Sequence, residues 1–415
     1  MKIIHVNNVD LTGNRFNGHD MQVALNKRGI GAKQFVMDKL GDDPNTIPLT
    51  YPYEEPFLRS RCMKFEREQS IHALIYPYLW RLLKHPDFKA ADVVHYHLLH
   101  NYFGSLAAFP AMTREKPSVL TIHDPWIFSG HCIYSLDCDR WKSGCGDCPR
   151  LDLIFPMEMD NTARMWEIKR QVFRRLDVDI VVASEYMMEL VKQSPITSHL
   201  ENVHLIPFGI DIGLFTQEKA SESIRKRLKI PKENFVIFFR QDPSPYKGIS
   251  YIKDMLEQLP ASKAVTILTV GHQGLLSKYA KKFQLIEKEW INDNHMIADL
   301  YAACDVFLMP STAEAFGLMA IEAMASGRPV VVLEGTSLPG VTFAPDCGIA
   351  LPREQSGALA ETVQRLMKNP EECRRRGELG RKLAKQHYRF EDYIERHIEL
   401  YEDILKRNRV KGGQK

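Results

Sequence analysis

The stretch Glu314-Ala-Phe-Gly-Leu-Met-Ala-Ile-Glu322, followed by Ala-Met-Ala-Ser-Gly327-Arg-Pro-Val-Val-Val332, decides the fold of the second half of the chain. A buried-strand pattern, Asp305-Val-Phe-Leu-Met309, comes shortly before it. A strand therefore leads into a loop and then a helix, which is the repeating unit of a parallel α/β sheet. Ligands of open α/β sheets bind outside the carboxyl ends of the strands, where this loop lies.

The loop and the helix carry groups suited to an anionic ligand that is rich in hydroxyls. Gly317 lets the backbone approach a ligand closely, and the first amides of the helix are unpaired donors that favour an anion such as a diphosphate. Glu314 precedes the helix and Glu322 lies inside it, so the pair can hold two hydroxyl-bearing parts of one extended ligand. The alternative interpretation is a helix cap and a solvated helix face.

The size and charge of the chain restrict its class. With 415 residues it is too long for one ordinary core, which predicts two domains of about 200 residues each. The formal charge is +3, from 55 basic and 52 acidic residues, so nothing global indicates nucleic-acid binding. No secretory signal and no membrane-length apolar run are visible in the sequence. We therefore expect a cytoplasmic protein.

Short apolar or β-branched runs alternate with helical-looking stretches in two series, which predicts two doubly wound, Rossmann-like domains with parallel sheets. The Pro/Gly-rich segment Pro207-Phe-Gly-Ile-Asp-Ile-Gly213 separates the series, so we assign the domains to 1–207 and 208–388. Helical spacing after Arg389 predicts a terminal helix over 389–408 that crosses back to the first domain. The predicted strands cover 2–6, 92–96, 118–122, 179–183, 203–206, 235–239, 265–270, 305–309 and 330–333.

A loop in the second domain brings two cations to the same sheet edge. In Phe238-Phe-Arg240-Gln-Asp-Pro-Ser-Pro-Tyr-Lys247-Gly248, a strand ends and Arg240 and Lys247 follow before the next helix. Both can neutralise a leaving diphosphate, because charge-assisted hydrogen bonds contribute roughly 1.5 to 3 kcal/mol each. The alternative is a surface loop with ordinary cations, and the glutamate pair favours the ligand site.

These motifs resemble the donor half of the retaining GT-B glycosyltransferases of family 4. The first half carries Asp92-Val-Val-His-Tyr-His97-Leu-Leu-His100-Asn101 and Thr121-Ile-His123-Asp124-Pro-Trp126-Ile-Phe-Ser-Gly130-His-Cys132. These runs resemble the branch that assembles bacterial exopolysaccharides and surface glycans, and the resemblance covers nearly the whole chain. It implies the GT-B fold, in which two Rossmann-like domains face a central cleft.

The resemblance also implies roles for individual residues. Glu322 would hold the ribose hydroxyls of a nucleotide sugar, Glu314 would contact the donor sugar, and Lys247 would stabilise the departing diphosphate together with Arg240. Such an arrangement requires no metal for catalysis. The implied catalytic residues are His123, Glu314, Arg240 and Lys247. The donor site adds Phe316 and Gly317 through their amides, with Leu318, Glu322 and Gly13, and the acceptor side holds His97, Asp124 and Trp126.

Histidines gather near strand ends of the first domain. By its spacing alone, His123 fits a hydrogen-bonded turn, whereas the resemblance implies that it approaches the transferred sugar. His95, His97 and His100 suggest a metal cluster at first sight. Strand alternation places His95 and His97 on one face with His100 beyond them, which favours packing or acceptor contact over a metal.

Four cysteines lie in a glycine-containing loop at 130–150 with the spacing C-x5-C-x6-C-x2-C: Cys132, Cys138, Cys145 and Cys148. Four thiolates can close a tetrahedral zinc site, and the Cys-Gly-Asp-Cys end has common knuckle spacing. Reduced thiols, disulfides and a redox role are the alternatives. A disulfide scaffold is not expected for eight cysteines in a chain of this size.

The segment between Phe57 and Lys89 is basic and aromatic. Its basic residues outnumber the acidic ones, and Tyr76, Tyr78 and Trp80 are interleaved with them. Such a stretch can lie on an anionic membrane surface. The alternative is a core helix whose cations extend to solvent.

The sequence thus predicts a hexosyltransferase-type, metal-independent, retaining enzyme. It would move a sugar from a nucleotide-sugar donor to a glycan or lipid-linked glycan acceptor, in peripheral contact with the inner face of the plasma membrane, and would bind no nucleic acid. A nucleotide-sugar epimerase of similar fold and a catalytically silent subunit of a glycan-assembly complex remain alternatives. The glutamate pair and the Arg/Lys loop favour the transferase.

Overall fold

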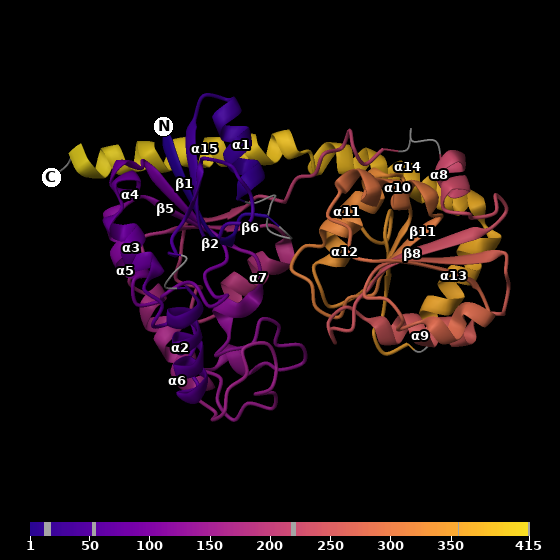
Figure 1. Cartoon of the computed structure of the whole chain (residues 1–415), viewed down its shortest axis with the longest axis horizontal. Coiled ribbons are helices and arrows are strands. Elements are labelled where there is room, and N and C mark those ends of the chain that lie inside the picture. Colours follow the sequence, from indigo (N-terminus) through magenta and orange to yellow (C-terminus); the bar gives the residue numbers. More distant parts are fainter. Residues whose placement is uncertain (12–17, 52–54, 217–220, 356, 414–415) are drawn as a thin grey trace. The chain divides into compact units, whose positions relative to one another are not determined.

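The computed structural model describes residues 1–11, 18–51, 55–216, 221–355 and 357–413. The chain divides into two compact units. The first unit comprises Met1–Ile206 and Ile394–Lys415, and the second comprises Pro207–Tyr393. Each unit is built on one parallel sheet with helices packed against it (Figure 1).

The first unit contains a seven-stranded sheet in the order β3-β2-β1-β4-β5-β6-β7. Connections run outward in opposite directions from β1 and β4, which makes their boundary the switch point of the sheet. The register pairs His5 of β1 with His95 of β4. The strands are β1 (Lys2–Val9), β2 (Gly31–Asp38), β3 (Thr46–Pro48), β4 (Val93–Tyr96), β5 (Ser118–Ile122), β6 (Asp179–Val182) and β7 (Val203–Leu205).

Short helices connect these strands, and most parallel strands require such a crossover. They are α1 (His19–Lys27), α2 (Glu55–Glu68), α3 (Tyr78–Lys84), α4 (Pro86–Ala90), α5 (Phe109–Glu115), α6 (Thr162–Phe173) and α7 (Glu185–Gln193), with the 3-10 turns η2 (Pro125–Phe128) and η3 (Arg140–Lys142). The segment between η2 and α6, drawn in magenta, is mostly irregular (Figure 1).

The second unit contains a six-stranded sheet in the order β10-β9-β8-β11-β12-β13. Its switch point lies between β8 and β11. The strands are β8 (Phe235–Gln241), β9 (Val265–Gly271), β10 (Gln284–Lys288), β11 (Val306–Met309), β12 (Val330–Leu333) and β13 (Ile349–Leu351). The helices are α8 (Ser221–Arg227), α9 (Ile249–Gln258), α10 (Asn294–Ala303), α11 (Leu318–Ala325), α12 (Leu338–Val341), α13 (Ala358–Lys368) and α14 (Pro370–His387), with the 3-10 turn η4 (Ser277–Lys281).

Strand alternation determines which helices cover each face of the second sheet. Ile237 and Phe239 of β8 share a buried cluster with residues of α9 and α13. Phe238, between them, faces the other way and meets Tyr301 of α10 at 5.2 Å between ring centroids. The helices α9 and α13 therefore lie on one face and α10 on the other, as Figure 1 shows. Both faces are apolar, which explains the continuous hydrophobic run in β8.

The long helix α15 (Phe390–Gly413) begins in the second unit and belongs to the first unit from Ile394 onward. Ile394, His397 and Tyr401 are each no more than 1% exposed, at the helical spacing that the sequence predicts. Tyr401 shares a 2.7 Å hydrogen bond with His95 of β4. The predicted fold class, two Rossmann-like sheets with a terminal helix returning to the first, is confirmed.

Four strands are absent from the sequence prediction, namely β2, β3, β10 and β13. The strands β3 and β13 have only three residues each, too few to show a period. In β2 the polar Lys33 and Gln34 interrupt the apolar run, yet Gln34 is fully buried. Its burial is determined by the neighbouring strands and not by local pattern.

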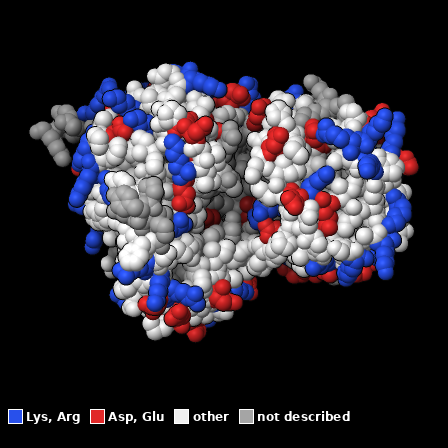
Figure 2. Space-filling model, viewed as in Figure 1, with Lys and Arg blue, Asp and Glu red and all other residues white. Residues whose placement is uncertain are grey.

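Charged side chains of both signs are interspersed over the face of the molecule in Figure 2. This distribution fits the near-neutral total charge of +3. Among the described helices, none combines the length and the apolar character that a membrane crossing requires.

Candidate active site

Two loops meet at the switch point of the second sheet. The loop after β8 and the loop after β11 touch through their backbones, because Thr312 donates its amide to the carbonyl of Tyr246 at 2.8 Å. Gly248 has φ +70°, and a Cβ atom there would lie 1.8 Å from the carbonyl oxygen of Pro310. Only glycine fits this approach. The structure thus brings together the two segments that the sequence singles out, at the edge where α/β sheets bind ligands.

Lys247 and Glu314 form an ion pair at this edge. The Nζ atom of Lys247 lies 2.8 Å from Oε2 of Glu314, and the two side chains are 24% and 14% exposed. A partly buried pair of this kind is held more firmly than one on an open surface. The ammonium group is therefore fixed beside the loop that precedes α11, within reach of solvent.

Arg240 has different partners. Its guanidinium lies 2.5 Å from Asp242 and 4.7 Å from the ring centroid of Trp290, which is 48% exposed. Neither Asp242 nor Trp290 is among the site residues that the sequence predicts. The spacing Arg-x-Asp was a usable signal, whereas the contact with Trp290 depends on the path of the chain after β10.

Gly317 forms the turn into α11. Its φ is +106°, and a Cβ atom would come within 2.4 Å of Leu338. The preceding Phe316 is 3% exposed and packs against Phe208 at 5.0 Å between ring centroids. Its carbonyl accepts a 3.0 Å hydrogen bond from the hydroxyl of Ser337. The side chain of Phe316 is thus a core group, which leaves only its backbone for ligand contact. Leu318 is the first residue of α11.

Glu322 lies on α11 behind this turn. The hydroxyl of Tyr301 donates to its carboxylate at 2.9 Å. Burial raises the pKa of Glu322 to about 7, and the Tyr301 bond offsets part of that increase. Ligand hydroxyls that donate to the carboxylate would stabilise its ionised form. Tyr301 also was not identified from the sequence, because it lies 21 positions away on a different helix.

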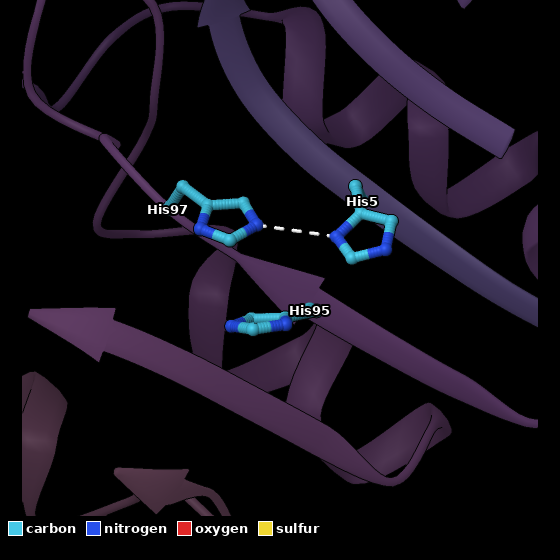
Figure 3. A group of neighbouring side chains, drawn as sticks. All are labelled: His5, His95 and His97. Atoms are coloured by element: carbon cyan, nitrogen blue, oxygen red, sulfur yellow. Dashed lines mark hydrogen bonds between the residues drawn. The ribbon is translucent and has the colours of Figure 1, made fainter. Parts of the chain in front are cut away.

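Histidines form a hydrogen-bonded chain at the switch point of the first sheet. Nδ1 of His5 lies 3.2 Å from Nε2 of His97, as Figure 3 shows. Nδ1 of His97 lies 3.2 Å from Nε2 of His123. Burial lowers the pKa of His5 to about 3 and that of His123 to about 4, and it also holds the pKa of His97 well below its usual value. All three rings are therefore neutral near pH 7.

A chain of neutral imidazoles has a direction, because each ring carries one N–H. Nε2 of His5 is buried without a hydrogen-bond partner among the described residues. A buried orphan N–H is rarer than an orphan acceptor, so the proton of His5 belongs on Nδ1. His5 then donates to His97, and His97 donates to His123. This assignment leaves the proton of His123 on Nδ1. His97 thus orients His123, and His5, absent from the sequence prediction, orients His97.

The His5, His95 and His97 rings also bring three ligand-type nitrogen atoms within 4.8 Å of one another. Both nitrogen atoms of His95 are already hydrogen-bonded at 2.7 Å, to Tyr401 and to Thr121. His97 likewise uses both of its nitrogens. A metal would have to displace these bonds. This cluster depends on the register of β1 and β4, which places His5 beside His95. Sequence spacing alone does not show that register.

Asp124 and Trp126 lie beside the histidine chain, around a cavity of about 20 Å³ that also contacts His97 and His123. This volume holds about one water molecule. Burial acts to raise the pKa of Asp124, but the 3.1 Å hydrogen-bond contact with Nε2 of His100 helps to lower it below its usual value. Trp126 is 1% exposed and stacks on His100 at 4.8 Å between ring centroids. Its side chain is a core group. Gly13 lies outside the described residues.

Comparisons with solved structures define the fold class. The chain matches sucrose-phosphate synthase from Thermosynechococcus elongatus with a TM-score of 0.71, at 19% identity, over 98% of this chain and 99% of that one. It matches the Anabaena protein HepE in complex with UDP and glucose with a TM-score of 0.65, at 16% identity, over 96% and 99%. The fold is therefore GT-B.

Two family models match successive parts of the chain: Glycosyltransferase Family 4 matches residues 35–214, and Glycosyl transferases group 1 matches residues 220–383. The chain therefore belongs to the glycosyltransferases of family 4 and group 1.

Curated relatives match parts of the chain. The MMP alpha-(1->4)-mannosyltransferase of Mycolicibacterium hassiacum is 26% identical over 58% of this chain and 57% of its own length. A putative colanic acid biosynthesis glycosyl transferase of Escherichia coli is 34% identical over 20% of this chain and 22% of its own length. An uncharacterized protein in the cps region of Klebsiella pneumoniae is 25% identical over 77% and 81%. The chain thus spans little more than half of the first relative and about a fifth of the second.

Proposed function

We propose that this chain is a retaining glycosyltransferase. It moves a hexose from a nucleotide-sugar donor to a glycan or lipid-linked glycan acceptor in the synthesis of a surface polysaccharide. The observation that carries the proposal is the arrangement at the switch point of the second sheet. There a fixed ammonium group and a glycine turn lie in the two loops, and the partly buried carboxylate of Glu322 lies on the helix that follows.

Each group has a part in donor binding. The ribose hydroxyls donate to Glu322, whose raised pKa makes the ionised form dependent on such donors. The amides after Gly317 meet the sugar or the phosphates. Lys247 and Arg240 pair with Glu314 and Asp242, and the diphosphate shares or replaces those carboxylates. Glu314 is then available for hydroxyls of the donor sugar.

The reaction breaks the bond between the anomeric carbon and the diphosphate oxygen, and that electron pair leaves with the nucleoside diphosphate. The acceptor hydroxyl forms the new bond to the same carbon, and its proton passes to the leaving group or to solvent. Charge grows on the diphosphate as the bond breaks, so Lys247 and Arg240 stabilise the transition state more than the ground state. The family resemblance implies His123 as a partner of the transferred sugar.

The relatives support a hexose donor and a surface-glycan product. A further HepE structure contains UDP-glucose, and curated relatives include the mannosyltransferase, the colanic acid protein and the protein of a cps region. A UDP- or GDP-hexose is accordingly the donor class we propose.

Nucleotide release from a panel of UDP-, GDP- and ADP-sugars tests the proposal. Wild type and Glu322→Ala are compared, each with and without a chelator. Release from one donor that is lost in the variant and unaffected by chelator is the expected result. Release from no donor, with saturable binding of none of them, would refute it.

The same panel separates the two alternative functions. An epimerase would convert the donor sugar without releasing nucleotide, and sugar analysis of the recovered donor detects this. A silent subunit would bind a donor and turn over none in the presence of acceptor glycans. The retained Lys247, Glu314 and Glu322 favour the transferase over both.

Helix α2 supports a membrane-associated acceptor. Cys62 and Glu66 face inward, whereas Phe57 and Phe65 are 61% and 47% exposed. Arg61 lies on the same outer side, 3.9 Å from the ring centroid of Phe57. We propose that this face docks on anionic lipid. In a flotation assay at low salt, wild type should rise with anionic liposomes, whereas a Phe57→Ser, Phe65→Ser double variant should not. Equal behaviour of both proteins would exclude α2 as the docking face.

A further inference from the structure

The loop between η2 and α6 gathers four thiols around one small cavity. Cys132, Cys138, Cys145 and Cys148 all line a space of about 20 Å³, together with His131. All four are free cysteines and partly exposed. They come from positions as far apart as 132 and 148, so the loop must fold back on itself to bring them together. None of these side chains belongs to the donor or acceptor residues described above.

The backbone holds this loop in an unusual conformation. Gly144, Cys145, Gly146 and Asp147 are four consecutive residues with positive φ, at 130°, 56°, 88° and 48°. Cysteine and aspartate rarely adopt such values without a compensating interaction. Residues outside the turn hold it in place, because the amide of Gly146 donates to the hydroxyl of Thr162 at 3.0 Å and the amide of Cys148 donates to the carboxylate of Asp160 at 2.6 Å. The amide of Gly130 also points at the sulfur of Cys145, at 3.2 Å. This amide would stabilise a thiolate there.

A buried lysine lies beside the thiols. Lys169 of α6 is fully buried, and its Nζ donates to the carbonyls of Trp126 and Ser129 at 2.6 and 2.8 Å. It also lies 3.5 Å from the ring centroid of Trp126. These partners are neutral, and burial lowers the pKa of Lys169 to about 7, so negative charge nearby is needed to keep it protonated. Asp124 and the ionised forms of Cys132 and Cys145 act in that direction. A four-thiolate cluster with a divalent metal carries a net charge of −2, which Lys169 would offset in part.

His131 provides a second indication. It is 1% exposed, and its Nε2 lies 3.5 Å from the sulfur of Cys148. Its Nδ1 has no hydrogen-bond partner within the described parts of the chain. The Nε2 atom faces the sulfur, so a neutral ring that carries its proton there can donate to a thiolate at Cys148.

We propose that Cys132, Cys138, Cys145 and Cys148 bind one structural zinc ion, with Lys169 and His131 supporting the cluster. Tetrahedral ligation at about 2.3 Å places the sulfur atoms about 3.8 Å apart. Among the described residues, no three of these four sulfur atoms lie within 4.8 Å of one another. Zinc binding must therefore draw the four side chains inward, which couples the metal to the order of this loop.

Zinc analysis of the full-length protein, purified under reducing conditions, tests the proposal. Wild type reconstituted with zinc and then dialysed should retain about one ion per chain. Cys145→Ser and Cys148→Ser should each retain much less. The matched control is Cys373→Ser, which removes a thiol of α14 in the second unit and should retain the wild-type amount. Equal zinc in all four proteins, or none in wild type, would overturn the proposal.

A second measurement uses the wild type alone, so its result does not depend on whether the cysteine variants fold. Thiols are alkylated in the native state with and without a chelator, and each modified cysteine is identified by mass spectrometry. The four loop cysteines should react at least tenfold faster once zinc is removed, whereas Cys373 should react at one rate throughout. Disulfides among the four in the reduced preparation, or unchanged rates, would overturn the proposal. Neither the zinc content nor the alkylation rate depends on glycosyl transfer. If the zinc proposal failed, the proposed glycosyltransferase function would therefore be unaffected.

Discussion

Replacing Glu322 by glutamine removes a negative charge at the proposed ribose contact and keeps the shape of the side chain. Burial raises the pKa of Glu322 to about 7. If ribose hydroxyls donate to the carboxylate, donor affinity follows its ionised fraction. That fraction falls from about 0.9 at pH 8 to about 0.1 at pH 6, so the affinity of wild type for the nucleotide should fall about tenfold. The glutamine variant should lack this fall of about tenfold and should show only the smaller pH dependence that both proteins share through the terminal phosphate of the nucleotide.

The variant should also bind more weakly at pH 8, by roughly ten- to a hundredfold, because charge-assisted hydrogen bonds are lost. Calorimetric titration with the nucleotide released by wild type, at pH 6, 7 and 8, measures both effects. A wild type whose affinity falls no more than that of the variant between pH 8 and pH 6, or a variant that binds as tightly as wild type at pH 8, would show that Glu322 does not contact the donor.

Without ligand, the stability that this carboxyl contributes should fall as pH rises, whereas the affinity for the nucleotide should rise. Since the folded pKa is raised, the contribution of this carboxyl to stability is complete below its ordinary pKa of 4.5 and is lost as pH rises through about 7. At 1.36 kcal/mol per pKa unit, the loss approaches about 3 kcal/mol at pH 8. Glu322→Gln should therefore melt above wild type at pH 8 and close to it near pH 5. The buried histidines are common to both proteins and cancel in the comparison.

Three further substitutions test other parts of the site. Lys247→Met should lower kcat about ten- to a hundredfold, because the leaving diphosphate loses a cation, and unchanged turnover would remove Lys247 from the site. Gly317→Ala should lower stability by roughly 1 to 3 kcal/mol, since its φ is +106° and the new Cβ would lie 2.4 Å from Leu338. Thermal melting measures this loss, and Gly340→Ala is the control because nothing lies within 4 Å of its new Cβ atom. Equal melting temperatures of the two variants would contradict the expected loss at Gly317. His97→Phe keeps a ring but removes the hydrogen bond to His123, so kcat should fall about tenfold with the donor KM unchanged. An unaltered kcat would show that His97 does not contribute to catalysis.

The sequence by itself determined the α/β class, the two series of strands and the loops that end at the sheet edges. These features follow from local rules, because apolar periodicity and glycine positions act within a few residues. Thus the Lys247 and Glu314 loops could be assigned to one sheet edge before their 2.8 Å contact was known.

Only the tertiary structure decided how those residues are partnered. The sheet order pairs β1 with β4 and so places His5 against His97, although 92 positions separate them. The packing of α10 on α11 gives Glu322 its Tyr301 bond and its raised pKa. The same packing rules bury Trp126, which the sequence assigns to the acceptor. Burial and protonation depend on neighbours distant in sequence, and local periodicity contains no information about which neighbours those are.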